Sequence, residues 1–230
     1  MRKVKAVITG DLVNSSLLGK GALNALLKSI EKYFTAQEIP FGFYRGDSFH
    51  ALCEVDMALK TACLLRTIAK QVSKKEGETG SDIRMAIGIG KVEEPVRNLG
   101  TAKGEAFILS GREMDHLGKD GPRLIMRCMD PLADNGLAAI SAFADFLIRN
   151  MTIKQAEVVH LLLQKATQKE VALKLGKTQP TINKHASAAY WNELEDLLKI
   201  YQKLAGLLVK QNKMHEYPIA YSANCCSPGF

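Results

Sequence analysis

The sequence lacks the features of several large classes of protein. No apolar run reaches the roughly 18 residues that span a bilayer, and no GxxxxGK[ST] phosphate loop occurs. The five cysteines form no CxxC pair, so we expect no structural zinc site. Internal repeats and low-complexity tracts are absent, and 24% charged with 47% hydrophobic residues excludes a disordered or fibrous chain. A globular protein of one or two domains remains, without a membrane partner.

The cysteines also indicate a compartment. Their number is odd, and three of them, Cys53, Cys63 and Cys128, lie inside apolar patterns, which fits reduced thiols. The apolar run at the amino end is broken by Asp11 and is too short for a signal peptide. We therefore predict a cytoplasmic protein.

Strand-like and helix-like patterns alternate in the first 130 residues. Apolar residues at helical spacing predict helices over 17–33, 56–73 and 103–117. β-rich runs predict strands over 4–9, 40–45, 48–54, 83–92 and 123–128. The order β-α-β-β-α-β predicts an α+β fold of ferredoxin-like outline, with helices on one face of a mainly antiparallel sheet.

The segment from Asp130 to Gly136 is the best candidate for a linker, because Pro, Asn and Gly interrupt it. Beyond it only helical patterns follow. We therefore predict an α+β domain over 1–133, an all-α domain over 134–212 and a flexible tail over 213–230.

The all-α part contains the spacing of a helix-turn-helix. Helices are predicted over 152–163, 168–175 and 178–191. Ala172 is small where the last two helices would cross, and Gly176 can adopt a left-handed turn. The apolar contacts between them would come from Val171, Leu175 and Ile182. This pattern predicts a DNA-binding module; the alternative is a plain helical hairpin that packs against the first domain.

In such a module the start of the second helix faces the base edges of double-stranded DNA. The residues expected at base edges are Thr178, Gln179, Thr181, Asn183 and Lys184. Those expected near phosphates are Lys169, Lys174 and Lys177. From Met151 onward there are ten Lys, no Arg and six Asp or Glu, an excess of four positive charges that suits this partner.

The last helix carries an apolar stripe at 3-4-3-4-3 spacing. Its members are Trp191, Leu194, Leu198, Tyr201, Ala205 and Leu208. The stripe predicts a homodimer through a coiled-coil seam. The alternative is a cover over the helices of the same chain.

Two Gly-Asp pairs end strand-like segments. Gly10-Asp11 follows the first strand, and Gly46-Asp47 forms the tip of a predicted hairpin. If the strands lie side by side, Asp11 and Asp47 project from the same edge and could hold Mg²⁺. The alternative is that both residues simply form turns.

The motifs GDLVNS, YRGDSFHAL, IRMAIGIG and KGEAFILSGREMD resemble the nucleotidyl-cyclase-like fold of class III cyclases and GGDEF proteins. The resemblance implies that Asp11 and Asp47 hold metal ions over a nucleoside triphosphate, with Arg112 stabilising the transition state. Ile108 occupies the position of the family's Asn, and Phe43 that of its purine-reading Lys. An apolar Ile cannot donate a hydrogen bond to phosphoryl charge, so we do not expect cyclase activity.

The segment QKEVALKLGKTQPTINKHA resembles the helix-turn-helix of sigma-factor region four and LuxR-type regulators, and residues 1 to about 200 resemble the SatD-like family. Together these features predict a DNA-binding transcriptional regulator whose first domain senses a metal or nucleotide ligand. One alternative is a metal-dependent enzyme acting on a nucleoside triphosphate. Another is a protein-interaction scaffold.

Overall fold

The computed structural model describes residues 2–13, 15–44, 46–72, 81–118 and 121–214. The strands within these ranges are β1 (Arg2–Val13), β2 (Phe41–Tyr44), β3 (Ser48–Cys53), β4 (Asp82–Glu93) and β5 (Leu124–Cys128). The helices are α1 (Lys20–Ala36), α2 (Ala58–Lys70), α3 (Glu105–His116), α4 (Pro131–Arg149), α5 (Ile153–Leu163), α6 (Gln168–Leu175), α7 (Gln179–Ala188) and α8 (Trp191–Met214), with 3-10 turns η1 (Ser15–Leu17) and η2 (Val55–Met57). Of the predicted tail, residues 215–230 lie outside the described residues.

The strands form one mixed sheet in the order β2-β3-β1-β4-β5. β1 lies in the middle and runs antiparallel to both β3 and β4, while β5 joins β4 in parallel. The succession from β1 to β4 is the predicted β-α-β-β-α-β order, with β3 between β1 and β2. The expectation of a mainly antiparallel sheet is confirmed.

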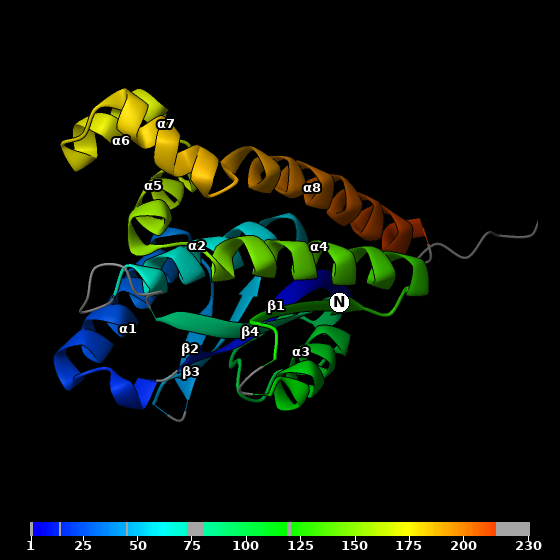
Figure 1. Ribbon diagram of the computed structural model, residues 1–230. Coiled ribbons are helices and arrows are strands. Elements are labelled where there is room, and N and C mark those ends of the chain that lie inside the picture. Colours follow the sequence, from blue (N-terminus) through cyan, green and yellow to red (C-terminus); the bar gives the residue numbers. More distant parts are fainter. Residues whose placement is uncertain (1, 14, 45, 73–80, 119–120, 215–230) are drawn as a thin grey trace, which may run out of the picture.

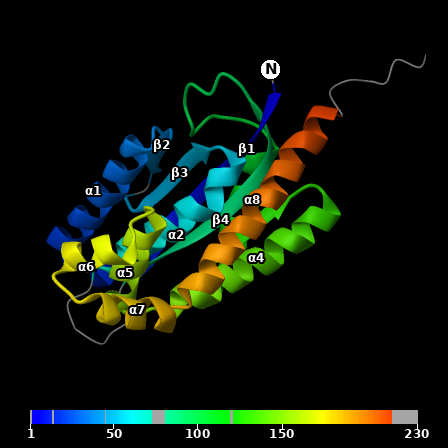
Figure 2. The same ribbon diagram turned by 90° about the horizontal axis from the view of Figure 1, so that it is seen from above.

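Helices cover both faces of this sheet, which corrects the expectation that they share one face (Figures 1 and 2). Along β1, Ile8 belongs to the main core with α1 and α2, whereas its neighbour Val7 packs with Ala106 of α3. Gly88 of β4 permits this second layer, because a Cβ there would lie 2.1 Å from the carbonyl oxygen of Ala106. Glycine is therefore required at this close approach of strand and helix.

The carboxyl-terminal helices pack onto the same core rather than beside it. α4 lies on β5 and α2, and α8 lies on α4, α2 and η2. The stripe of α8 faces inward, with Leu194, Tyr201 and Leu208 buried and the Tyr201 hydroxyl donating a hydrogen bond to the carbonyl of Val55 at 2.5 Å. The stripe is thus the intramolecular cover, and the predicted coiled-coil seam is wrong because these side chains are already buried. A homodimer and a domain boundary near residue 133 stay predictions. The linker predicted from Asp130 to Gly136 is wrong, because Asp130 caps α4 and the residues after it form the first turns of that helix.

A buried ion cluster joins α2, β4 and α4. The completely buried Arg66 donates to both carboxylate oxygens of Asp82, at 2.8 and 2.7 Å, and to Asp145 at 2.7 Å. Arg149 donates to the second oxygen of Asp145 at 2.6 Å. Burial alone would raise the pKa of Asp82, but the Arg66 guanidinium overrides this effect and holds that pKa below its usual range.

The helix α4 is unusually apolar for its length. Among the described residues, α4 is long and apolar enough to cross a membrane by length and composition alone, with a mean hydropathy of 1.2 and 44% of that window buried. Its apolar residues, such as Leu137 and Ile148, lie in the main core, and Asp145 near its end pairs with Arg66. Burial accounts for only part of the apolar composition of α4, because Leu132, Phe143 and Phe146 are exposed.

We predict that Arg66→Met lowers the free energy of unfolding by about 3–5 kcal/mol, because two buried carboxylates lose their shared partner. Urea unfolding followed by circular dichroism measures the change. The control is Lys199→Met, which removes an exposed pair with Glu195 on α8 and should cost no more than about 0.5 kcal/mol. Equal losses in the two variants would contradict the structural role of the cluster.

Candidate functional site

The two predicted acidic residues lie at one end of the sheet. The register of β1 with β3 places Asp11 opposite Ser48, the residue that follows Asp47. Gly46 has a φ of 84°, which lets the chain turn tightly before Asp47. The hydroxyl of Ser15, in η1, donates a hydrogen bond to Asp47. The structure therefore brings together the segments that carry both carboxylates. We call this end of the sheet, with Asp11 and Asp47, the acidic end.

A basic residue occupies the space beside them. Arg84 of β4 is the cross-strand partner of Asp11, and its Nε and Nη2 donate to the two carboxylate oxygens at 2.9 and 2.5 Å. The hydrogen bond that Arg84 donates to Asp11, together with the charges of Asp11 and Asp47, raises the pKa of Arg84. The sequence patterns did not single out Arg84, since nothing in its local spacing signals that β4 pairs with β1.

These contacts do not fit the predicted Mg²⁺ site. Mg²⁺ needs carboxylate oxygens that are free to coordinate, whereas both oxygens of Asp11 accept hydrogen bonds from Arg84. Within the described ranges, no group of three or more His, Cys, Asp or Glu side chains gathers anywhere. The guanidinium supplies the positive charge that a metal ion would otherwise provide.

The helix α3, which carries the Ile108 and Arg112 of the cyclase resemblance, ends close to Arg84, because Nη1 of Arg84 donates a hydrogen bond to the carbonyl of Leu117 at 3.2 Å. Ala106 and Ser110 face the sheet and are buried, whereas Ile108 is 62% exposed and Arg112 is also exposed. Ile108 and Arg112 therefore share the outer face of α3. Nothing in this arrangement directs Arg112 toward Asp11 within the chain.

A polar network lies next to Asp11 on the same face of the sheet. The hydroxyl of Thr9 is 3.0 Å from Nδ1 of His50 and 3.0 Å from the hydroxyl of Ser110. The ring of Tyr44 stacks on His50 with centroids 4.4 Å apart, and burial lowers the pKa of His50. Because Thr9 stands between His50 and Ser110, the histidine is held as a structural partner and does not activate the serine.

The second region of interest is formed by α5, α6 and α7. Their contacts make a small separate core, formed by Val158, Leu162, Val171, Ala172, Ile182 and Ala186. Gly176 ends α6 in the left-handed conformation, with φ 61° and ψ 37°. The N–H of Lys177 then donates to the carbonyl of Ala172 at 2.9 Å, which closes the helix end. Three residues, Gly176 to Thr178, thus connect α6 to α7.

The predicted DNA contacts divide into two groups on this surface. Seven are exposed, namely Lys169, Lys174, Lys177, Thr178, Gln179, Asn183 and Lys184, and Thr181 is half-buried. Thr178 and Thr181 also cap α7, since the Thr178 hydroxyl accepts from the Thr181 N–H at 3.4 Å and lies 2.9 Å from its hydroxyl. A threonine before a helix carries this capping signal in the sequence as well.

No protein-family model matches the chain, and comparison with curated proteins finds no relative. The similarity to the SatD-like family therefore stays a prediction.

Solved structures of nucleotidyl cyclases overlap about half of the chain. One is a bacterial light-regulated adenylyl cyclase, with 14% identity, a TM-score of 0.43, and 55% of this chain and 77% of that chain covered. Another is the active GGEEF domain of a diguanylate cyclase from Vibrio cholerae, with 15% identity, a TM-score of 0.39, and coverage of 55% and 81%. The adenylyl cyclase CyaB from P. aeruginosa has 15% identity and a TM-score of 0.38, and the match covers 55% of this chain and 78% of that chain. At these identities and TM-scores, no residue role is carried over from these cyclases to this chain.

We predict that Arg84→Gln lowers the free energy of unfolding by about 1–3 kcal/mol, because Asp11 loses its charged hydrogen-bond partner. Millimolar Mg²⁺ should raise the thermal midpoint of this variant, in which Asp11 and Asp47 are no longer neutralised, and should leave the unsubstituted protein unchanged. The control is Asp11→Asn/Arg84→Gln, which should not respond. A clear response of the unsubstituted protein would show that a metal displaces Arg84.

Proposed function

We propose that this protein binds double-stranded DNA through α6 and α7 and acts as a transcriptional regulator. The observation that carries the proposal is the two-sided character of α7. Ile182 and Ala186 on its inner side are buried against α5 and α6, whereas Gln179, Asn183 and Lys184 on its outer side are exposed. A helix held by its apolar side with a polar, basic outer side suits insertion into the major groove.

The charges around α7 favour a polyanionic partner. Residues 169–184 contain four Lys and one acidic residue, Glu170, a difference of three positive charges. Glu170 is held at the start of α6, where it accepts a hydrogen bond from the N–H of Thr167 at 2.7 Å. Lys177 precedes the start of α7 and Lys184 lies in its second turn, where both could contact phosphate.

The position of α6 and α7 favours this function over a hairpin that merely packs on the sheet. α5 has two buried sides: Val159 and Leu163 join the main core, and Val158 and Leu162 join the small core. α5 therefore attaches the unit to α2, and α7 packs on α5, α6 and α8. In Figure 1, α6 and α7 project beyond the sheet, where a duplex could approach.

A second candidate is an enzyme or sensor acting on a nucleoside triphosphate. The observation in its favour is that Asp11, Asp47 and Arg84 gather at one end of the sheet from three segments. Binding of Mg²⁺ with the nucleotide would require Asp11 to exchange Arg84 for the metal. Turnover of ATP or GTP that disappears in Asp47→Asn would support this candidate, and no turnover would leave the acidic end as a structural feature.

We predict that duplex binding weakens steeply with salt, with a slope of log K against log [salt] of about −3 to −4, since the four exposed lysines of this surface, Lys169, Lys174, Lys177 and Lys184, each release about 0.9 counterion on neutralising a phosphate. Lys177→Ala or Lys184→Ala should reduce the slope by about one unit. Fluorescence anisotropy with a labelled random duplex at several salt concentrations measures both effects.

The matched control is Lys203→Ala, an exposed lysine on α8 away from this surface, which should leave the slope unchanged. Asn183→Ala should change the preference among duplex sequences more than the slope, because an Asn reads base edges rather than phosphates. Absence of duplex binding at low salt would overturn the proposal, and binding of a protein partner without salt dependence would favour the interaction scaffold.

A further inference from the structure

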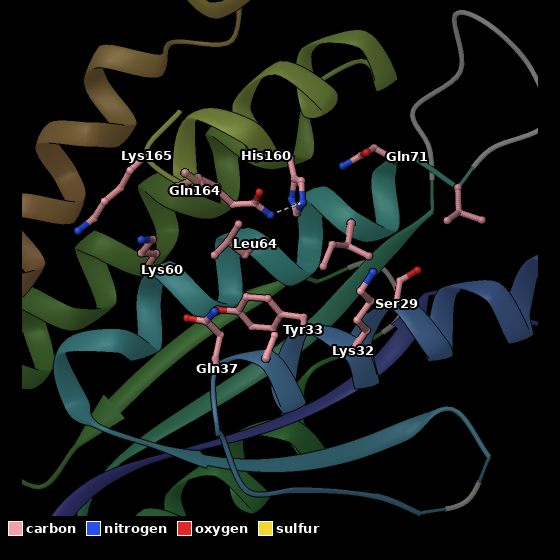
Figure 3. Close-up of a pocket in the computed structure, with 14 residues that line it drawn as sticks. Ser29, Lys32, Tyr33, Gln37, Lys60, Leu64, Gln71, His160, Gln164 and Lys165 are labelled. Atoms are coloured by element: carbon pink, nitrogen blue, oxygen red, sulfur yellow. Dashed lines mark hydrogen bonds between the residues drawn. The ribbon is translucent and has the colours of Figure 1, made fainter. Parts of the chain in front are cut away.

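A cavity of about 700 Å³ opens between α1, α2 and α5, and neither Asp11, Asp47 nor any residue of α7 lines it. Its apolar lining consists mainly of Leu64 and Ile68 of α2 and Leu163 of α5. Tyr33 of α1 contributes its ring, and its hydroxyl lies 3.2 Å from that of Thr61. Figure 3 shows Tyr33 and Leu64 beneath His160 and Gln164. The volume is within the range of small-molecule sites.

Three lysines from three segments line this cavity. Lys32 comes from α1, Lys60 from α2, and Lys165 from the residues after α5. In Figure 3, Lys60 and Lys165 lie toward one end and Lys32 toward the other. The lining residues that the structure describes include no Asp or Glu. The pKa of Lys60 is lowered by burial and by the charge of Lys165, so these two cations repel each other without a carboxylate between them.

The neutral polar groups of the cavity already have partners. Nδ1 of His160 lies 3.0 Å from the Thr67 hydroxyl, and its Nε2 lies 2.9 Å from the Gln164 amide nitrogen. Burial, with the charge of Lys174, lowers the pKa of His160, so the ring is neutral near pH 7. The charge in the cavity therefore comes from the lysines alone, as far as the described lining residues extend.

Lys165 occupies a backbone position that usually belongs to glycine. Its φ is 66°, and the N–H groups of Lys165 and Ala166 close the end of α5 by donating to Leu162 at 2.9 Å and Leu161 at 3.2 Å. A non-glycine residue is strained in this left-handed position. Glu38 and Tyr190 share this conformation, and what distinguishes Lys165 is its place at a cavity with two other lysines.

We infer that this cavity binds a small organic anion with an apolar body, with the anionic group between Lys60 and Lys165 and the body against Leu64, Ile68 and Leu163. The lysines complement the charge, and the helix surfaces bury the apolar part. The site is separate from α7 and from the acidic end, so it stands independently of the proposed function. A ligand in this cavity would link α5 to α1 and α2. Because α5 also contributes Val158 and Leu162 to the small core, the ligand would contact the helix that holds α6 and α7.

Isothermal titration of the full chain with octanoate, and with octanol as its neutral analogue, tests the inference. Octanoate should bind at least about tenfold more tightly than octanol, the equivalent of one charge-assisted hydrogen bond. Lys60→Gln and Lys165→Gln should each reduce the octanoate affinity about fivefold to tenfold. The matched control is Lys28→Gln, an exposed lysine of α1 that does not line the cavity and should have no effect.

Lys165→Gly separates loss of the site from loss of the fold. Glycine accepts the left-handed backbone at this position without strain, so the thermal midpoint should stay the same or rise while octanoate affinity falls. Equal affinity for octanoate and octanol would overturn the inference. So would octanoate binding that is unchanged in Lys60→Gln/Lys165→Gln.

Discussion

The ion cluster around Arg66 is the interaction on which the arrangement of the whole molecule depends. It joins a helix of the α+β part, the first residue of β4 and the helix that begins the all-α part. A completely buried guanidinium is tolerated only when its donors are matched by carboxylates, so α2, β4 and α4 have one way of packing together. That packing in turn supports α5 and α8, and α5 carries α6 and α7.

Charge pairing also decides what the acidic end can do. Asp11 and Asp47 approach each other because β1 and β3 are neighbours, and Arg84 of β4 offsets one of the two negative charges by pairing with Asp11. The same geometry that suggests a metal site is thus satisfied by a side chain of the protein itself. The basic surface of α6 and α7 has no comparable internal partner beyond Glu170 among its described residues, which is why we assign binding to that surface.

Much of the architecture could be predicted from local patterns. Alternating apolar residues and Gly-Asp turns indicate the strands, and the neighbourhood of Asp11 and Asp47 follows from strand order. The pairing of Asp11 with Arg84 could not be predicted, because it depends on the register between strands 73 residues apart in sequence. The stripe on α8 was ambiguous, since the same spacing serves packing within a chain and between chains. The lysine cavity arises only when α5 packs on α1 and α2.

The outer side of α7 is the surface that we propose for contact with DNA. The most direct test of this contact is nuclear magnetic resonance of the ¹⁵N-labelled full chain titrated with a short random duplex at low salt. If DNA binds at this surface, the largest amide shifts fall in α6, the following turn and the first half of α7, and the amides around Asp11 and Arg84 do not change. Shifts confined to the acidic end, with α7 unaffected, would contradict this contact.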